Sequence, residues 1–243
     1  MKRLDDGDGA HSHRLAGGGA AGIRLAIGAP LALVLLTACG TTLFSSDFDQ
    51  TAPGSPPAVT QRVGTASVEG PPGSVTVVAS PAPPSGRWVR IERTAGPHVP
   101  GLQCRLSATR GEGEYTLTTT LFIPSGAEVV TVQAETAVPD APAFFHVDFL
   151  EDGRVRLDDD PSTVFGTFPH DAPFILQVTF DIEAASSTAR VVLSGAGASG
   201  ARDHPIRPAL QSFARQFGAV QLLIGFPHVG RFEATNIVVK YEQ

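Results

Sequence analysis

The sequence predicts an all-β protein, an antiparallel β-sandwich with at most one short helix. From about Ser46 onward the apolar residues fall into runs of about 5 to 10 residues, divided by Gly, Pro and Asp. Helical periodicity is nearly absent, and no repeat of fixed period suggests a second domain. The chain has 243 residues with 26 Gly, 20 Pro and 42% hydrophobic residues, enough apolar content for a buried core between many turns.

The N-terminal 38 residues are predicted to be a targeting segment. Basic residues precede an uncharged stretch from Leu25 to Leu36, whose twelve residues would span about 18 Å as a helix, well short of a bilayer core of ~30 Å. The sequence Leu36-Thr-Ala-Cys39-Gly40 follows, and it resembles the lipobox of bacterial lipoproteins, which implies that Cys39 is the lipidated first residue of the mature chain. The alternatives are a secretory signal cut elsewhere and an inner-membrane anchor.

These features predict three regions: a signal peptide over 1–38, a lipidated N-terminus with a short tether over 39–46, and the sandwich over 47–243. The resemblance implies a bacterial cell-envelope location with membrane lipid as a partner through acylated Cys39. Gly40, standing where some lipoproteins carry an Asp, suggests the outer membrane. The formal net charge of −6 argues against a nucleic-acid partner, because such proteins need clustered basic residues.

Cys104 is predicted to be a buried structural thiol. It alternates with other residues so that it shares one strand face with Leu102 and Leu106. With Cys39 acylated, no second thiol is left for an intrachain disulfide. The alternative is a reactive or intermolecular thiol.

The predicted strands share alternating apolar residues and flanking turn residues, and in chain order they cover 63–69, 74–79, 87–94, 102–109, 114–123, 127–136, 143–150, 154–158, 163–168, 174–183, 188–194, 219–226 and 231–241. One helix is predicted over 209–217, after Pro208. The segment Gly195 to Gly200 is expected to be a loop.

Two hairpins can be registered from the sequence. A three-residue loop ending at Gly153 would pair Phe149 with Val155, and therefore Val147 with Leu157, Asp148 with Arg156 and His146 with Asp158. The loop 184–187 would pair Ile182 with Ala189, Phe180 with Val191, Val178 with Leu193 and Asp181 with Arg190. Apolar pairs carry the stability of such hairpins, and exposed ion pairs add little.

Several segments stand in the order of strands and turns: Asp47-Phe48-Asp49, Pro56-Pro57, Val63 to Val68, Trp88 to Ile91, Gly113 to Thr118, Phe149 to Val155 and Phe232 to Val239. This order resembles the laminin-G-like, concanavalin A-like jelly rolls of bacterial surface proteins. The resemblance implies a convex and a concave sheet, with sugars bound on the concave sheet or at the end loops. The last strand has Thr235-Asn236 where family members commonly have Asp-Asn or Asp-Asp, so a polar or metal role is not carried over to it.

Glycosidase chemistry is not predicted. Related jelly-roll hydrolases place their carboxyl groups as Glu-x-Asp-x-(x)-Glu on one strand. The nearest match, His146-Val-Asp148-Phe-Leu-Glu151, has His in the first position and Glu151 in a turn. The sequence therefore predicts that the protein is not an enzyme, and His146 and Asp148 are read either as ligand contacts or as a solvated strand face.

Two further groups are candidate sites. Trp88 shares a strand face with Arg90 and Glu92, opposite Val89 and Ile91, so it is either a stacking platform for a sugar ring or a residue that closes one end of the core. The carboxylates of Asp158, Asp159 and Asp160 could bind Ca²⁺, the alternative being an acidic turn. No other cofactor is predicted.

The sequence thus favours a lipid-anchored binding or scaffolding module, for a glycan or for an envelope partner. The alternatives are a carbohydrate-active enzyme, glycosidase or lyase, on the same scaffold and a purely structural envelope lipoprotein. An exposed aromatic strip would favour the binding module, and a facing pair of carboxyl groups would favour the enzyme.

Overall fold

The computed structural model describes residues 40–82, 85–138, 142–182, 187–206 and 216–243. The predicted signal peptide, Cys39 and nearly all of the predicted helix 209–217 lie outside these ranges. The described chain is built from antiparallel strands in two sheets, with one 3-10 turn, Pro161–Thr163. The predicted all-β antiparallel sandwich is confirmed. No helix among the described residues is both long and apolar enough to cross a membrane.

Sheet A has the strand order β13-β12-β11-β6-β15-β4-β3, and β1 pairs with β15 beside β4. Its strands are β1 (Thr41–Ser46), β3 (Val75–Ala79), β4 (Arg87–Arg93), β6 (Gly113–Phe122), β11 (Phe174–Ile182), β12 (Thr188–Ser194), β13 (Gly200–Pro205) and β15 (Gly230–Glu242). Sheet B has the order β10-β9-β8-β7-β14-β5-β2. Its strands are β2 (Thr65–Glu69), β5 (Gly101–Arg110), β7 (Val129–Thr136), β8 (Phe145–Leu150), β9 (Arg154–Leu157), β10 (Gly166–Thr167) and β14 (Phe217–Leu223).

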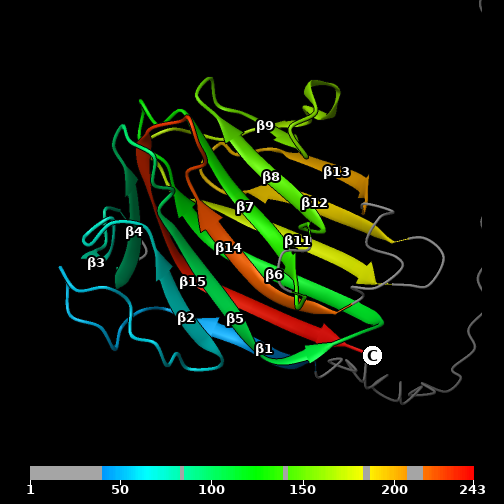
Figure 1. Cartoon of the computed structure of the whole chain (residues 1–243). Helices are drawn as coiled ribbons and strands as arrows, with labels where there is room; N and C mark the ends of the chain where they lie inside the picture. The colour runs from blue at the N-terminus through cyan, green and yellow to red at the C-terminus, as the bar shows by residue number, and fades with distance from the viewer. Residues whose placement is uncertain (1–39, 83–84, 139–141, 183–186, 207–215) are drawn as a thin grey trace, which may run out of the picture. The chain divides into compact units, whose positions relative to one another are not determined.

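The two sheets face each other across one hydrophobic core, and sheet B lies in front of sheet A in Figure 1. Aromatic rings fill one region of this core, where Tyr115 stacks on Phe180 at 5.2 Å and meets Phe217 edge-on at 5.3 Å. Cys104 is fully buried, and burial raises its pKa far above the usual thiol range. The predicted buried structural thiol is confirmed among the described residues.

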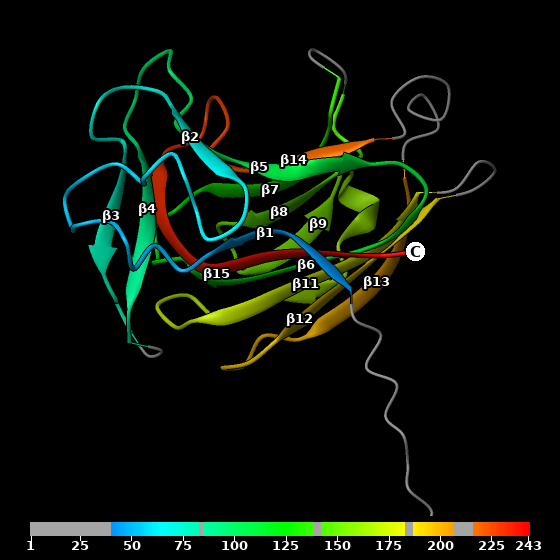
Figure 2. The same ribbon diagram turned by 90° about the horizontal axis from the view of Figure 1, so that it is seen from below.

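The outward-pointing face of sheet B, called here the outer face of sheet B, is bordered by loops. In Figure 2 sheet A curves beneath sheet B, and the β2–β3, β4–β5 and β14–β15 connections rise beyond sheet B on one side. Because the side chains of a strand alternate between the core and the solvent, this face carries every second residue of seven strands. It is therefore a broad surface bordered by raised loops.

The β8–β9 hairpin has the predicted register. Phe149 pairs with Val155 and Val147 with Leu157, while Asp148 lies opposite Arg156. Gly153 has φ 80°, the left-handed conformation that favours glycine. This turn chemistry fixed the register, because only one loop length puts a glycine at that position.

The predicted register of the β11–β12 hairpin is wrong by two residues. Phe180 pairs with Ala189 and Val178 with Val191, and Arg190 forms its ion pair with Asp203 of β13 rather than with Asp181. A shift of two residues keeps the same side chains facing the core, so alternation alone cannot distinguish the two registers.

Strands β1 and β13 were not predicted. Residues 41–46, expected in the tether, form β1 along β15, and its Leu43 and Phe44 are buried in the core. β13 is an edge strand that begins at Gly200, where a loop was expected, and its residues are polar or only half-buried. Neither segment shows a simple apolar alternation, so each is recognised as a strand only by its pairing with a neighbouring strand.

Candidate functional site

Five polar side chains lie in one row across the outer face of sheet B. Ser67 of β2 pairs with Gln103 of β5, and Gln103 pairs with Gln221 of β14. Gln221 pairs in turn with Gln133 of β7, which pairs with His146 of β8. The row therefore crosses five adjacent strands, with three amides at its centre.

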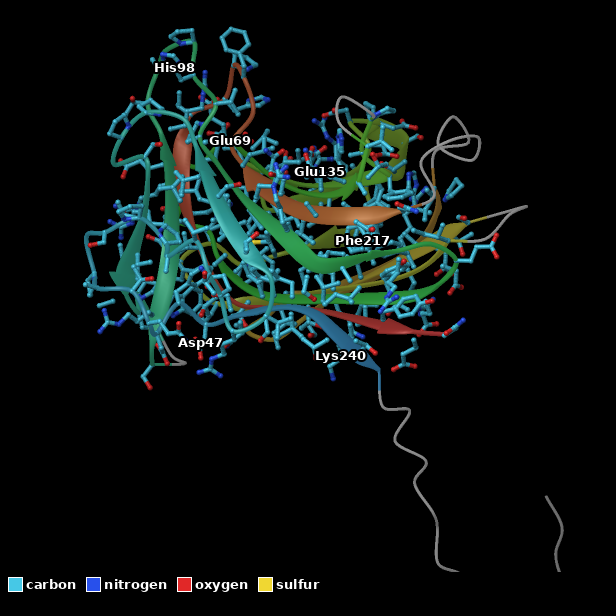
Figure 3. All side chains as sticks on the ribbon, turned by 60° about the horizontal axis from the view of Figure 1, so that its bottom comes forward. Asp47, Glu69, His98, Glu135, Phe217 and Lys240 are labelled. Carbon is cyan, nitrogen blue, oxygen red and sulfur yellow. The ribbon has the colours of Figure 1, made fainter. Side chains whose placement is uncertain are left out.

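Hydrogen bonds tie the three amides to two glutamates, and this set of Gln103, Gln133, Gln221, Glu69 and Glu135 is called the amide network. Gln133 Nε2 donates to Gln221 Oε1 at 2.5 Å and to Glu135 Oε1 at 3.0 Å. Gln103 Nε2 donates to Glu135 Oε2 at 2.8 Å, and Gln221 Nε2 donates to Glu69 Oε2 at 2.9 Å. Figure 3 shows both glutamates on one side of the sandwich, opposite Asp47 and Lys240.

The carboxylates determine which way the amides point. An ionised carboxylate only accepts hydrogen bonds, so each bonded amide must turn an N–H toward it. Among the described residues, one side-chain N–H of Gln103 and one of Gln221 have no hydrogen-bond partner. The side-chain carbonyl oxygen of Gln133 has none either. The network thus presents both donors and acceptors at fixed positions on the surface.

Two hollows lie at opposite ends of this face along β7. One, of about 300 Å³, is lined by Glu135, Gln103 and Arg105 together with apolar Leu106 and Val138. The other, of about 560 Å³, is lined by Glu128, Val129, Leu150, Glu151, Asp152 and His228. Six residues of β7 separate Glu135 from Val129, which corresponds to about 20 Å. The amide network borders the first hollow through Gln103 and Glu135, and β7 runs from there to the second hollow, so the face offers one extended track.

A second polar group on this face, the carboxyl cluster, contains Asp148, Asp159, Arg156 and His146. Arg156 Nε donates to Asp148 Oδ2 at 3.3 Å, and Arg156 Nη2 donates to Asp159 Oδ1 at 2.8 Å. Thr131 Oγ1 donates to Asp148 Oδ1 at 2.8 Å, and His146 Nδ1 lies 3.8 Å from Asp159 Oδ2. Two carboxyl groups therefore contact one guanidinium.

Burial raises the pKa of Asp148, which is only 2% exposed. The negative charge of Asp159 raises this pKa as well, while the hydrogen bond from Thr131 and the charges of Arg156 and His146 oppose the shift. Asp159 in contrast exposes 67% of its side chain. The cluster therefore pairs a buried carboxyl group, whose pKa is raised, with an exposed one.

Comparison with known proteins establishes the fold. No family model and no curated protein sequence matches the chain. A GH131 β-glucanase catalytic domain from Podospora anserina is similar, with TM-score 0.51 and 12% identity over 82% of this chain and 96% of that one. Lectin II from Ulex europaeus is similar, with TM-score 0.50 and 8% identity over 84% of this chain and all of that one. The fold is a concanavalin A-like jelly roll.

A sialidase of Trypanosoma rangeli also matches, with TM-score 0.47 and 15% identity, but this chain covers only 30% of that longer protein. The likeness to the glucanase corrects one prediction. The sequence predicted that the protein is not an enzyme, and that prediction is contradicted, because the same fold forms the catalytic domain of a glycoside hydrolase. The incomplete carboxylate motif on one strand was too narrow a criterion, since two strands and a turn can bring carboxyl groups together.

Of the two readings of Trp88, the sugar platform is wrong and the buried residue is right. Trp88 is fully buried and Glu92 is exposed, while Arg90 Nε binds Glu233 Oε1 at 2.8 Å. Alternation correctly placed Trp88 opposite Val89, on the outward face of sheet A. Alternation gives the face of a side chain and does not show whether that face is covered. A buried indole cannot stack on a sugar ring.

The three aspartates proposed for Ca²⁺ do not converge. Asp158 Oδ1 accepts from the backbone N–H of His146 at 2.8 Å, and Asp158 Oδ2 lies 2.8 Å from His204 Nε2. Asp159 binds Arg156, and Asp160 accepts from the backbone N–H of Ser162 at the start of the 3-10 turn. No group of three potential metal ligands is found in the described part of the chain. The alternative interpretation, an acidic turn without a bound ion, describes this geometry.

Among the predicted ligand contacts, His146 and Asp148 do lie on the outer face of sheet B, beside the amide network. Sequence reasoning missed Gln103, Gln133, Gln221, Glu69 and Glu135. A glutamine at an alternate strand position reads as an ordinary solvent-facing residue. The signal that could have found the row is the pairing of sheet B, which joins strands far apart in the sequence.

Proposed function

We propose that this domain is carbohydrate-active and binds a glycan chain along the outer face of sheet B. The amide network is the observation that carries this proposal. The likeness of the fold to a glucanase catalytic domain and to a lectin supports it. The chain would extend from the hollow at Glu135 to the hollow at Glu128.

The chemistry of the network suits sugars. Each sugar hydroxyl both donates and accepts a hydrogen bond, and a side-chain amide offers both functions. The carboxylates already orient the amides, so little side-chain entropy is lost when a ligand binds. The apolar residues beside the polar ones, such as Leu106, Val129 and Leu150, would contact the C–H groups of the sugar rings.

A glycan array followed by calorimetry on the purified full chain tests the proposal. Gln133→Ala removes the central amide of the row and should weaken binding about tenfold, as expected for lost neutral hydrogen bonds of ~1 to 1.5 kcal/mol. The matched control is Gln177→Ala, an exposed glutamine in the middle of β11 on the outward face of sheet A. Equal affinities of the two variants, or no binding by the wild-type protein, would rule the proposal out.

Hydrolysis is the second candidate function, favoured by the carboxyl cluster. Glycosidases use two carboxyl groups about 5 to 9.5 Å apart. Asp148 and Asp159 bind the same guanidinium, and burial raises the pKa of Asp148, the direction that favours a general acid. Asp148 would protonate the leaving oxygen while Asp159 acts as base or nucleophile.

Reducing ends released from a soluble β-glucan measure this activity. Asp148→Asn should lower the rate at least a hundredfold, since general acids contribute about 10² to 10⁴, yet leave binding intact. The wild-type rate should fall as pH rises through the raised pKa of Asp148, because the acid must be protonated. Asp203→Asn, which breaks the Asp203–Arg190 ion pair on sheet A, is the matched control. Binding without any release of reducing ends would exclude the second candidate alone.

We also propose that Cys39, two residues before the start of β1, anchors the domain to a membrane of the bacterial cell envelope. The support is the lipobox-like sequence around Cys39 and the start of β1 at Thr41. Membrane lipid would then be a partner in addition to the glycan.

A further inference from the structure

The connection between β14 and β15 carries an exposed aromatic ring. This loop, 224–229, rises on the side of the outer face of sheet B (Figures 2 and 3). Phe226 exposes 70% of its surface there. It is the one aromatic residue among the large exposed hydrophobic residues of the described chain. A single exposed apolar side chain is common on protein surfaces, so exposure alone marks no site.

The ring of Phe226 is held in place from below. The guanidinium carbon of Arg93 lies 5.4 Å from the ring centroid, a cation–π distance. Arg93 itself is only 3% exposed. One side of the ring thus rests on a buried cation, while most of its surface is open to the solvent.

Arg93 is fixed by the backbone of two loops. Its Nε donates to His98 O at 2.9 Å, its Nη2 to Gly96 O at 2.5 Å, and its Nη1 to His228 O. No carboxylate among the described residues forms an ion pair with it. The guanidinium therefore joins the β4–β5 connection to the β14–β15 connection and sets the position of the ring between them.

The same loop borders the track. His228, two residues after Phe226, lines the hollow of about 560 Å³ together with Glu128. His228 Nδ1 lies 3.3 Å from Glu128 Oε2, and the backbone N–H of Val229 donates to Glu128 Oε2 at 3.1 Å. These contacts tie the loop to the start of β7, so the loop that carries Phe226 borders the Glu128 end of the track.

We propose that Phe226 is an aromatic subsite at this end of the track, where a pyranose ring stacks by its apolar face, and that Arg93 is the residue that positions it. The inference rests on the proposed glycan binding and deepens it. A pyranose with mainly equatorial hydroxyls presents C–H groups on its ring face, and such a face matches an open phenyl ring. The positioned ring is already ordered, so stacking costs little conformational entropy.

The test compares oligosaccharides of increasing length, taken from the glycan class that the wild-type full chain binds. Phe226→Ala should weaken binding about tenfold for oligosaccharides that span the ~20 Å track, and Phe226→Trp should preserve it. Val59→Ala is the matched control, because Val59 is also 70% exposed. It should bind as the wild-type protein does.

Arg93→Lys should give a similar loss, and adding it to Phe226→Ala should cause no further loss, because both changes act through one ring. An additive loss would overturn the positioning role of Arg93. If Gln133→Ala weakens binding but Phe226→Ala does not, the subsite is wrong while the glycan-binding face stands. If neither variant changes affinity, the proposed function itself fails. If Phe226→Ala changes only self-association or vesicle binding, the ring serves another contact and the subsite is wrong.

Discussion

At the scale of single residues, burial and partners separate the functional candidates from the structural ones. Gln103, Gln133 and Gln221 keep hydrogen-bonding groups directed at the surface, whereas Trp88 is fully buried. Glu233 is a third kind of residue. It is 1% exposed on the outward face of sheet A, its Oε1 accepts from Arg90, and its Oε2 has no partner among the described residues. A buried carboxylate oxygen without a donor destabilises the ionised form.

Glu233 should make stability depend on pH. Burial raises its pKa, against the opposing effect of the hydrogen bond and charge of Arg90. A raised pKa in the folded state favours the protonated form, so this contribution to stability is complete below the unfolded pKa of about 4.3 and is lost as pH rises through the folded value. Glu233→Gln keeps an acceptor for Arg90 and cannot ionise.

Thermal unfolding at several pH values from 4 to 7 checks this expectation. The melting temperature of Glu233→Gln should improve relative to the wild-type protein as pH rises, because only the wild-type protein loses the contribution. Other carboxyl groups affect both proteins equally and cancel in the difference. A constant difference across this range would show that Glu233 titrates normally.

At the scale of elements, the sequence determines faces better than it determines partners. The β8–β9 register followed from the position of Gly153, whereas the β11–β12 register was wrong by two residues because both registers bury the same side chains. Edge strands such as β13 escape prediction for another reason, because they show little apolar alternation. The position of such an edge strand in the sheet depends on the strand with which it pairs.

The candidate site shows the same limit. His146 and Asp148 were found because they lie on one predictable strand, β8. The amide network draws its residues from β2, β5, β7 and β14, which are adjacent only after the sheet has formed. The carboxyl cluster joins β8, β9 and the turn at Asp159. To predict a site assembled from strands that are distant in the sequence, one must know the strand order. The periodicity of apolar residues along each strand does not give that order.

At the scale of the whole described domain, the proposed anchor and the proposed glycan track lie on different sheets. β1 begins at Thr41 and pairs with β15 of sheet A, and the track lies on the outer face of sheet B. In Figure 3 Lys240 of β15 lies on the opposite side of the sandwich from Glu69 and Glu135. A lipid on Cys39 would be about two residues from β1, a reach of ~7 Å. Anchoring would therefore bring sheet A toward the membrane and leave the track accessible.

Replacing Cys39 should separate anchoring from binding. Cys39→Ala removes the thiol that would carry the lipid, and acyl chains contribute ~0.8 kcal/mol per buried CH₂ to membrane attachment. The variant should leave the membrane fraction, lose the mass of the lipid and keep the glycan affinity of the anchored protein, because the track faces away from β1. Fractionation, intact mass and calorimetry measure the three outcomes. A variant that stays with membranes at unchanged processing would disprove the lipid anchor, and a released variant with altered affinity would show that the anchored side takes part in binding.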